Sequence, residues 1–132
     1  MKKFLIYWLP VLLWMGLIFG LSHQSSLHVS DVQVYDFVLK KTAHVMVYAT
    51  LTLLLWRAIH FTTEVFFVRS SLWAGLVAWL YAMSDEFHQR FIPGRYASVR
   101  DVLIDLAGIC LALAVLWGFK YLGDRRMKTD NR

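Results

Sequence analysis

Polar side chains recur at helical spacing in three stretches of this sequence. Residues three and four positions apart share one face of an α-helix. The stripes with this spacing are Lys41, His44 and Tyr48, then Asp85, His88 and Gln89, and finally Asp101, Asp105 and Gly108. Each stripe adjoins a long apolar run, where an ionised side chain costs up to about 2.5–3.5 kcal/mol in a bilayer and must face polar partners or water. We therefore expect the stripes to converge on one polar site.

The carboxylates and imidazoles of these stripes allow two kinds of chemistry. Oxygen and imidazole ligands can hold a divalent metal, and the candidate metal ligands are His44, Asp85, Glu86 and His88. No spaced ligand motif such as H-E-x-x-H accompanies them, so this signal is weak. Alternatively, a histidine beside a carboxylate could transfer protons while basic side chains hold a phosphate or carboxylate group.

The second kind of chemistry gives each polar residue a role. The candidate catalytic residues are Glu86, Asp85 and His44, and the candidate substrate-binding residues are Lys41, Tyr48, Gln89, Arg95, Asp101 and Asp105. Lys41 and Arg95 would hold the anion. Asp105 lies a full turn inside an apolar segment and needs a cation or donors, for which Arg95 is the first candidate. Whether the chain is an enzyme stays open.

Several polar residues also have a purely structural interpretation. Ser98 and Asp101 match the S-x-x-D pattern of a helix capping box, and this interpretation is as strong as a site role. Arg90 and Arg100 are better explained as solvated charges at a membrane interface. Cys110 is the only cysteine, so no internal disulfide can form.

Composition places the chain in a membrane. Of its 132 residues, 58% are hydrophobic and 17% are charged, whereas soluble domains carry about 25% charged residues. A soluble chain this short could not bury so many apolar side chains. Apolar segments at residues 4–21, 42–57, 69–87 and 102–122 predict an all-α integral membrane protein with a four-transmembrane-helix bundle.

Two segments near the start of the chain carry further predictions. The first apolar run is longer than a signal-peptide core and no A-x-A cleavage site follows it, so we interpret it as a retained span. Ser30 and Gln33 have capping-box spacing. They predict a short helix before the second span, with Val34, Phe37 and Val38 buried.

Basic residues predict the orientation. An even number of spans puts both termini on one side, together with the connection that holds Arg57 and Arg69. That side has nine Lys and Arg residues and the other side has five. The positive-inside rule therefore predicts cytoplasmic N- and C-termini and an outward-facing polar cluster. Residues 1–123 would form the transmembrane domain, followed by a charged cytoplasmic tail at 124–132.

The polar stretches resemble the motifs of a known membrane family. The run from Asp85 to Arg95, followed by Ser98 and Asp101, resembles the long signature of the VanZ-like family. The other two motifs of that family are matched in the same order by Lys41 to His44 with Tyr48, and by Ser22 to Ser25. The similarity runs from about Phe4 to Leu122.

This resemblance implies a bacterial plasma-membrane protein with several spans, in a family whose namesake accompanies resistance to the glycopeptide teicoplanin. The family's polar signature falls on Lys41, His44, Tyr48, Asp85, Glu86, Gln89, Arg95 and Asp101. Family members often have Glu just before the tyrosine of the second motif, where this chain has Val47. The resemblance implies no settled reaction.

Three hypotheses for function follow. The leading one is a cell-envelope protein whose outward polar pocket binds or acts on an anionic lipid or a lipid-linked cell-wall component and influences glycopeptide susceptibility. The alternatives are a small transporter-like subunit and a non-catalytic structural or accessory membrane protein. The net charge of +5 includes no Lys/Arg run of the nucleic-acid-binding type. The expected partner is therefore the lipid bilayer and not a nucleic acid, and the oligomeric state is not predicted.

Overall fold

The chain folds into four α-helices over the residues that the computed structural model describes, which are 2–23, 33–93 and 98–130. The helices are α1 (Lys2–Ser22), α2 (Gln33–Thr63), α3 (Phe67–Gln89) and α4 (Val99–Asp130). No strand occurs within the described ranges. The predicted all-α fold is confirmed.

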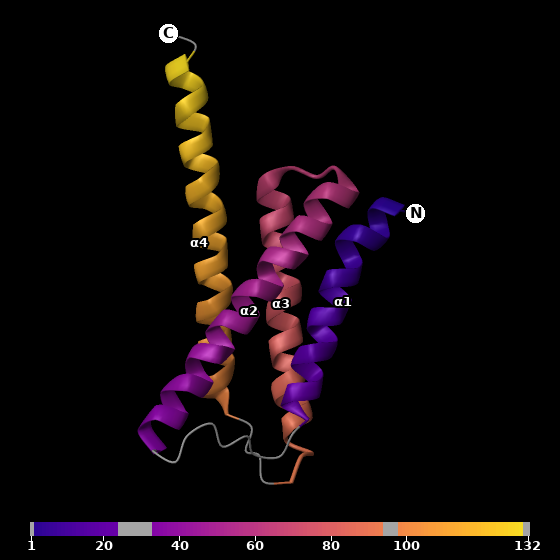
Figure 1. The fold of residues 1–132 in the computed structure, drawn as a ribbon, viewed down its shortest axis with the longest axis vertical. Coiled ribbons are helices and arrows are strands. Elements are labelled where there is room, and N and C mark those ends of the chain that lie inside the picture. The colour runs from indigo at the N-terminus through magenta and orange to yellow at the C-terminus, as the bar shows by residue number, and fades with distance from the viewer. Residues whose placement is uncertain (1, 24–32, 94–97, 131–132) are drawn as a thin grey trace.

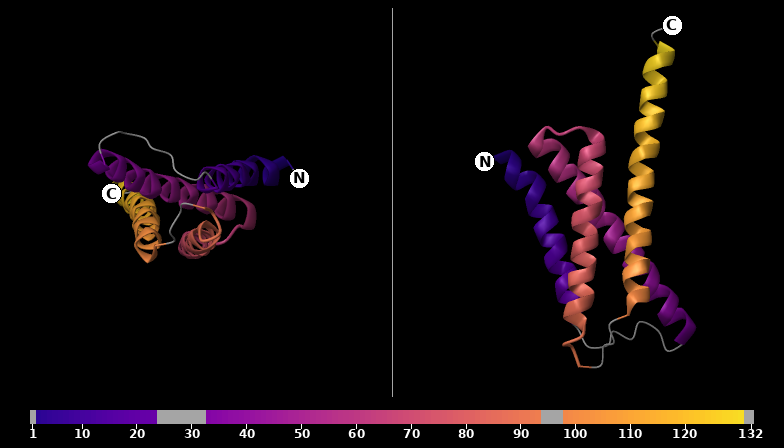
Figure 2. Two further views of the ribbon diagram at one scale, coloured as in Figure 1. Left: turned by 90° about the horizontal axis from the view of Figure 1, so that it is seen from below. Right: turned by 180° about the vertical axis from the view of Figure 1, so that it is seen from behind.

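Successive helices alternate in direction, which gathers their ends into two groups. The start of α1, the α2–α3 connection and the end of α4 point toward one end of the molecule, and the remaining helix ends lie toward the other (Figure 1 and Figure 2). α2 and α3 each pack against all three other helices, with α2 making the more extensive contacts, whereas α1 and α4 make no contact over their described lengths. The positions of α1 and α4 are therefore set by their packing against α2 and α3.

Small side chains let α3 pack closely into the core. Ala74, Ala78 and Ala82 recur every four residues along α3 and are fully buried. They form a core with buried aliphatic side chains that include Leu51 and Leu55 of α2. Small residues at this spacing allow helix backbones to approach closely, which is the usual way that helices pack in membranes.

The closest contact between helices occurs where α2 crosses α4. A Cβ atom built on Gly108 would lie only 2.3 Å from the carbonyl oxygen of Val45. No side chain fits there, so the two backbones are in direct contact. This contact fixes the position of α4 along the axis of α2. It therefore decides which polar residues of the two helices meet.

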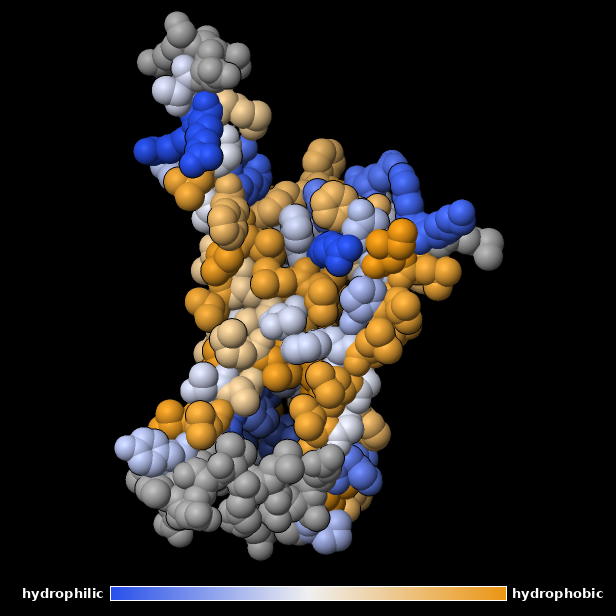
Figure 3. Space-filling model, in the orientation of Figure 1, coloured by the Kyte–Doolittle hydropathy of each residue, from blue (hydrophilic) through white to orange (hydrophobic). Residues whose placement is uncertain are grey.

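The outside of the molecule is largely apolar. Large hydrophobic side chains are exposed along the helices, and they form the broad hydrophobic surface between two more hydrophilic ends in Figure 3. Three of the described helices contain segments long and apolar enough to cross a membrane, at Lys2–Ser22, Phe37–Thr63 and Val99–Thr129. α3 falls short of this criterion, and it carries Asp85 and Glu86 near its end.

The prediction of a separate short helix before the second span is wrong. α2 is one helix from Gln33 to Thr63, and Ser30 lies outside the described residues. Phe37 and Val38, which were expected to be buried, are exposed. Lysine has good helix propensity, so the two lysines at positions 40 and 41 do not interrupt α2.

Helix α4 runs through the predicted boundary between the transmembrane domain and the charged tail, where Gly123 lies. α4 continues past this glycine to Asp130. A glycine inside a helix costs only about 1 kcal/mol relative to alanine. The ion pair between Lys120 and Asp124, with 3.0 Å between Nζ and Oδ2, is a helix-stabilising i, i+4 pair that spans this position.

Candidate functional site

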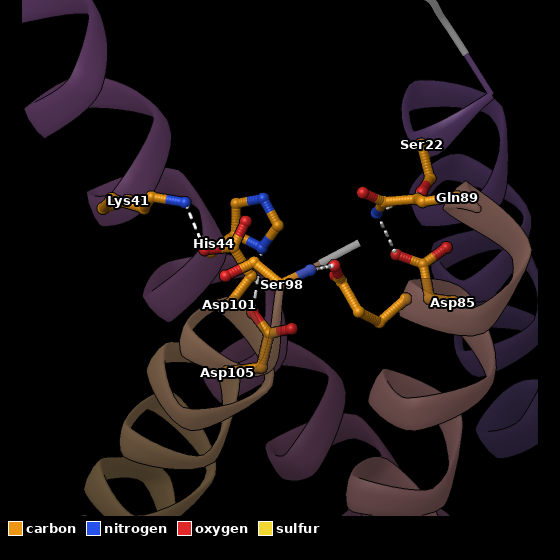
Figure 4. A network of polar contacts seen from close by, with 9 residues as sticks. Ser22, Lys41, His44, Asp85, Gln89, Ser98, Asp101 and Asp105 are labelled. Atoms are coloured by element: carbon orange, nitrogen blue, oxygen red, sulfur yellow. Dashed lines mark hydrogen bonds and ion pairs between the residues drawn. The ribbon is translucent and has the colours of Figure 1, made fainter. Parts of the chain in front are cut away.

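Polar side chains from all four helices gather toward the molecular end where α4 begins (Figure 4). We call this set the polar network, and it consists of Ser22, Lys41, His44, Asp85, Glu86, Gln89, Ser98, Asp101 and Asp105. Figure 3 shows a hollow lined with hydrophilic residues near the same end. The network has two halves joined at one point.

The first half joins α2 to α4 through two ion pairs one turn apart. Lys41 Nζ binds Asp101 Oδ1, and His44 Nδ1 lies 2.9 Å from Asp105 Oδ1. The matching spacing lets two successive turns of α2 pair with two successive turns of α4. Asp105 is only 1% exposed, so the imidazole supplies the partner that a buried carboxylate requires.

The second half joins α1 to α3. Gln89 Nε2 donates to Ser22 Oγ at 2.7 Å and to Asp85 Oδ2 at 3.1 Å. All three residues are buried. The amide of Gln89 therefore links the end of α1 to a carboxylate one turn back on α3, as Figure 4 shows.

Glu86 connects the halves by capping α4 from another helix. Ser98, just before α4, accepts a hydrogen bond at its Oγ from the Arg100 backbone N–H at 3.2 Å. In a capping box the residue three positions on would accept the N–H of the cap. Here Glu86 of α3 accepts the Ser98 N–H instead. Asp101, the expected partner in that box, is thereby free to pair with Lys41.

Two polar atoms beside this network are buried and have no hydrogen-bond partner among the described residues. They are the hydroxyl oxygen of Tyr48 and Oδ1 of Asp85. Tyr48 is 1% exposed and lies within electrostatic range of Asp85, Asp105 and Glu86. Buried polar atoms without partners cost stability, so these two atoms are polar positions beside the network that the described residues leave unsatisfied.

The charges of the network are unequal. It holds the carboxylates of Asp85, Glu86, Asp101 and Asp105, but only Lys41 and His44 can carry a positive charge. Arg95, the second predicted basic ligand, lies outside the described residues, and so does any contact between it and Asp105. The part of the site that is described is therefore acidic.

The candidate metal ligands are not brought together. No group of three or more His, Cys, Asp and Glu side chains in the described part of the chain could hold a metal ion. His88 instead stacks with His23, with 3.4 Å between the His88 Nε2 and His23 Nδ1 atoms, and its ring also lies against Phe19. Of the four candidate metal ligands, His88 therefore lies apart from the polar network that contains His44, Asp85 and Glu86.

One member of the network and one role within it were not predicted from the sequence. Ser22 was noted only as part of a motif, although its hydroxyl accepts from Gln89. Glu86 was expected to act in chemistry, and its observed role includes holding the first turn of α4. The place of Ser22 in the short Ser/Gln motif was the available signal for the first. No sequence pattern indicates a cap that comes from another helix.

The fold and the site together define a class of protein. An apolar exterior, three membrane-length helices among the described residues and an interior network of ionisable side chains are the features of a multi-spanning membrane protein. The family model described as VanZ/LLP1 matches residues 5–120, so the chain belongs to the VanZ-like family. No curated protein and no solved structure matches the chain.

Proposed function

We propose that this VanZ-like protein binds the head group of an anionic lipid or a lipid-linked cell-wall component in the bacterial plasma membrane, and that it thereby influences glycopeptide susceptibility. The observation that carries the proposal is the buried network of ionisable side chains at one end of an otherwise apolar helix assembly. Charges at such a depth are expensive, and they usually mark a functional site.

The proposed topology puts this network on the outer face of the membrane. Four spans with cytoplasmic termini agree with the excess of Lys and Arg on the side of the chain ends. The network lies at the opposite end of the helices from the starts of α1 and α3. An outward site would meet the head groups of the outer leaflet and the membrane-bound precursors of the wall.

In this proposal Lys41 is the anion ligand within the described network. Its ion pair with Asp101 is partly open, with side-chain exposures of 23% for Lys41 and 18% for Asp101. A phosphate oxygen could therefore approach the ammonium group from the solvent side. Arg95 is the predicted second ligand. His44, Asp85 and Glu86 would transfer protons if the bound molecule is also a substrate.

Lipid binding can be tested with a matched pair of lysine variants. Purified Lys41→Gln is expected to retain phosphatidylglycerol about tenfold less well than wild type, because a charge-assisted hydrogen bond to phosphate is lost. Lys120→Gln, which removes the lysine of the ion pair at the other end of α4, should bind like wild type. Native mass spectrometry in detergent micelles measures both. Equal retention by both variants would contradict the proposal.

A structural role is the second candidate, and the ion pairs between α2 and α4 favour it. Lys41 with Asp101 and His44 with Asp105 satisfy one another without any ligand. If the ion pairs serve only to hold the helices together, Lys41→Asp and Asp101→Lys should each lower thermal stability. The double variant with both changes should restore thermal stability and lipid retention. Recovered stability with lost lipid retention would exclude the purely structural role.

A further inference from the structure

The two buried atoms without partners require explanation beyond the pairing of the network. Asp85 Oδ1 and the Tyr48 hydroxyl oxygen are both buried without a described hydrogen-bond partner. Asp85 is 7% exposed and Tyr48 is 1% exposed. The other carboxylate oxygen of Asp85 already accepts from Gln89. The carboxylate oxygen can only accept a hydrogen bond, whereas the tyrosine hydroxyl can accept as well as donate, so a bound donor could satisfy both oxygens.

The surrounding charge indicates what kind of donor it is. Lys41 is paired with Asp101 and His44 with Asp105. Glu86 accepts a neutral backbone N–H and Asp85 accepts a neutral amide. The carboxylates of α3 therefore have no cationic partner among the described residues. Negative potential beside these α3 carboxylates attracts a positive group, whereas the anion of the proposed function would bind beside Lys41 on α2.

We propose that Asp85 and Tyr48 form a binding site for a primary ammonium group. Such a group has three N–H donors. In this proposal one N–H donates to the unpartnered oxygen of Asp85 and another to the oxygen of Tyr48, while the positive charge offsets the carboxylate. A water molecule could supply donors without the charge. A quaternary ammonium has the charge without donors. A metal ion would need more ligands than the described residues gather.

The inference rests on the proposed function and extends it. A head group with a phosphate beside Lys41 and an amine beside Asp85 would contact both halves of the network, which α4 and Glu86 hold together. The amine could belong to a lipid such as phosphatidylethanolamine, or it could be a small soluble amine. Both sources present the same chemistry to Asp85 and Tyr48.

The test compares an ethanolamine lipid with its N-trimethylated choline counterpart, and includes phosphatidylglycerol as a lipid without an amine. The purified full-length chain in detergent micelles is titrated with short-chain phosphatidylethanolamine, phosphatidylcholine and phosphatidylglycerol, and separately with free ethanolamine. Native mass spectrometry gives the affinities. We expect the ethanolamine lipid to bind about tenfold or more tightly than the choline lipid, because only its charged nitrogen donates hydrogen bonds.

Variants assign the preference to the site. Asp85→Asn and Tyr48→Phe are each expected to abolish the preference for phosphatidylethanolamine. Asp124→Asn, the same kind of change at the exposed far end of α4, should keep it. Tyr48→Phe changes no charge and little volume, so it provides an answer if Asp85→Asn does not fold. Circular dichroism and gel filtration check the fold of each variant.

The outcomes separate this inference from the proposed function. Equal binding of the ethanolamine and choline lipids, or a preference that survives both site variants, overturns the ammonium site. If phosphatidylglycerol still binds in a Lys41-dependent manner, the proposed function then stands alone. If free ethanolamine binds as tightly as the ethanolamine lipid and depends on Asp85, the ammonium site is supported for a soluble amine, and the proposed function then depends on the Lys41-dependent binding of phosphatidylglycerol alone.

Discussion

The pair formed by His44 and Asp105 is the most demanding interaction in the protein. Asp105 is 1% exposed, and the His44 Nδ1 atom lies 2.9 Å from its Oδ1. A carboxylate buried this deeply is tolerated because an imidazole from the neighbouring helix binds it. This pair joins α2 to α4 one helical turn further along each helix than the more exposed pair of Lys41 and Asp101.

Removing one partner of this pair should be more harmful than removing both. His44→Leu is expected to lower the free energy of unfolding by about 3–5 kcal/mol, because it leaves a buried carboxylate unpaired. The double variant His44→Leu with Asp105→Leu should recover much of that loss, since apolar side chains of similar size often replace buried ion pairs without penalty. Unfolding by sodium dodecyl sulfate in mixed micelles measures both. A double variant as unstable as the single one would contradict this account.

Helix α4 is positioned by two features that lie outside its own polar stripe. Glu86 of α3 accepts the N–H of Ser98 before its first turn, and Gly108 rests against the Val45 backbone of α2. The first feature decides where α4 begins relative to α3. The second decides how closely it approaches α2. Together they bring Asp101 and Asp105 opposite Lys41 and His44.

The contact at Gly108 leads to a prediction with an internal control. Gly108→Ala should destabilise the protein by about 1–3 kcal/mol, because the added methyl group forces the backbones of α2 and α4 apart. Gly118→Ala, also in α4, adds a methyl group with nothing within 4 Å. It should be neutral or stabilising by up to about 1 kcal/mol, since alanine favours a helix over glycine. Thermal unfolding in detergent compares the two. Equal stability of the two variants would mean that the close contact has no energetic role.

The arrangement of the complete chain in the membrane can be tested by chemical labelling. Both chain ends and the α2–α3 connection lie toward one end of the helices (Figure 1), and the basic residues predict that this end is cytoplasmic. After Cys110→Ser, a Tyr96→Cys variant in intact cells should react with an impermeant maleimide. A Thr63→Cys variant should react only after lysis. The reverse pattern would place the polar network inside the cell.

The sequence alone determined the class of structure and which helix faces carry most of the polar side chains. Apolar segments of membrane length predicted an all-α membrane protein, and helical spacing put Lys41 with His44 and Asp101 with Asp105 on common faces. The all-α fold is confirmed, and Lys41 and His44 do meet Asp101 and Asp105, whereas His88 contacts His23 instead. The number of spans and the orientation of the termini stay predictions.

Only the tertiary structure decided which groups pair. Periodicity fixes the face of a helix on which a side chain lies, but the partner on another helix depends on how the two helices are rotated and shifted. That shift is set by a backbone contact at Gly108 and by a cap from Glu86. Asp105 therefore pairs with His44 and Asp101 pairs with Lys41, whereas His88 lies outside the polar network and contacts His23. These pairings arise from contacts between residues far apart in the chain, which local sequence patterns do not encode.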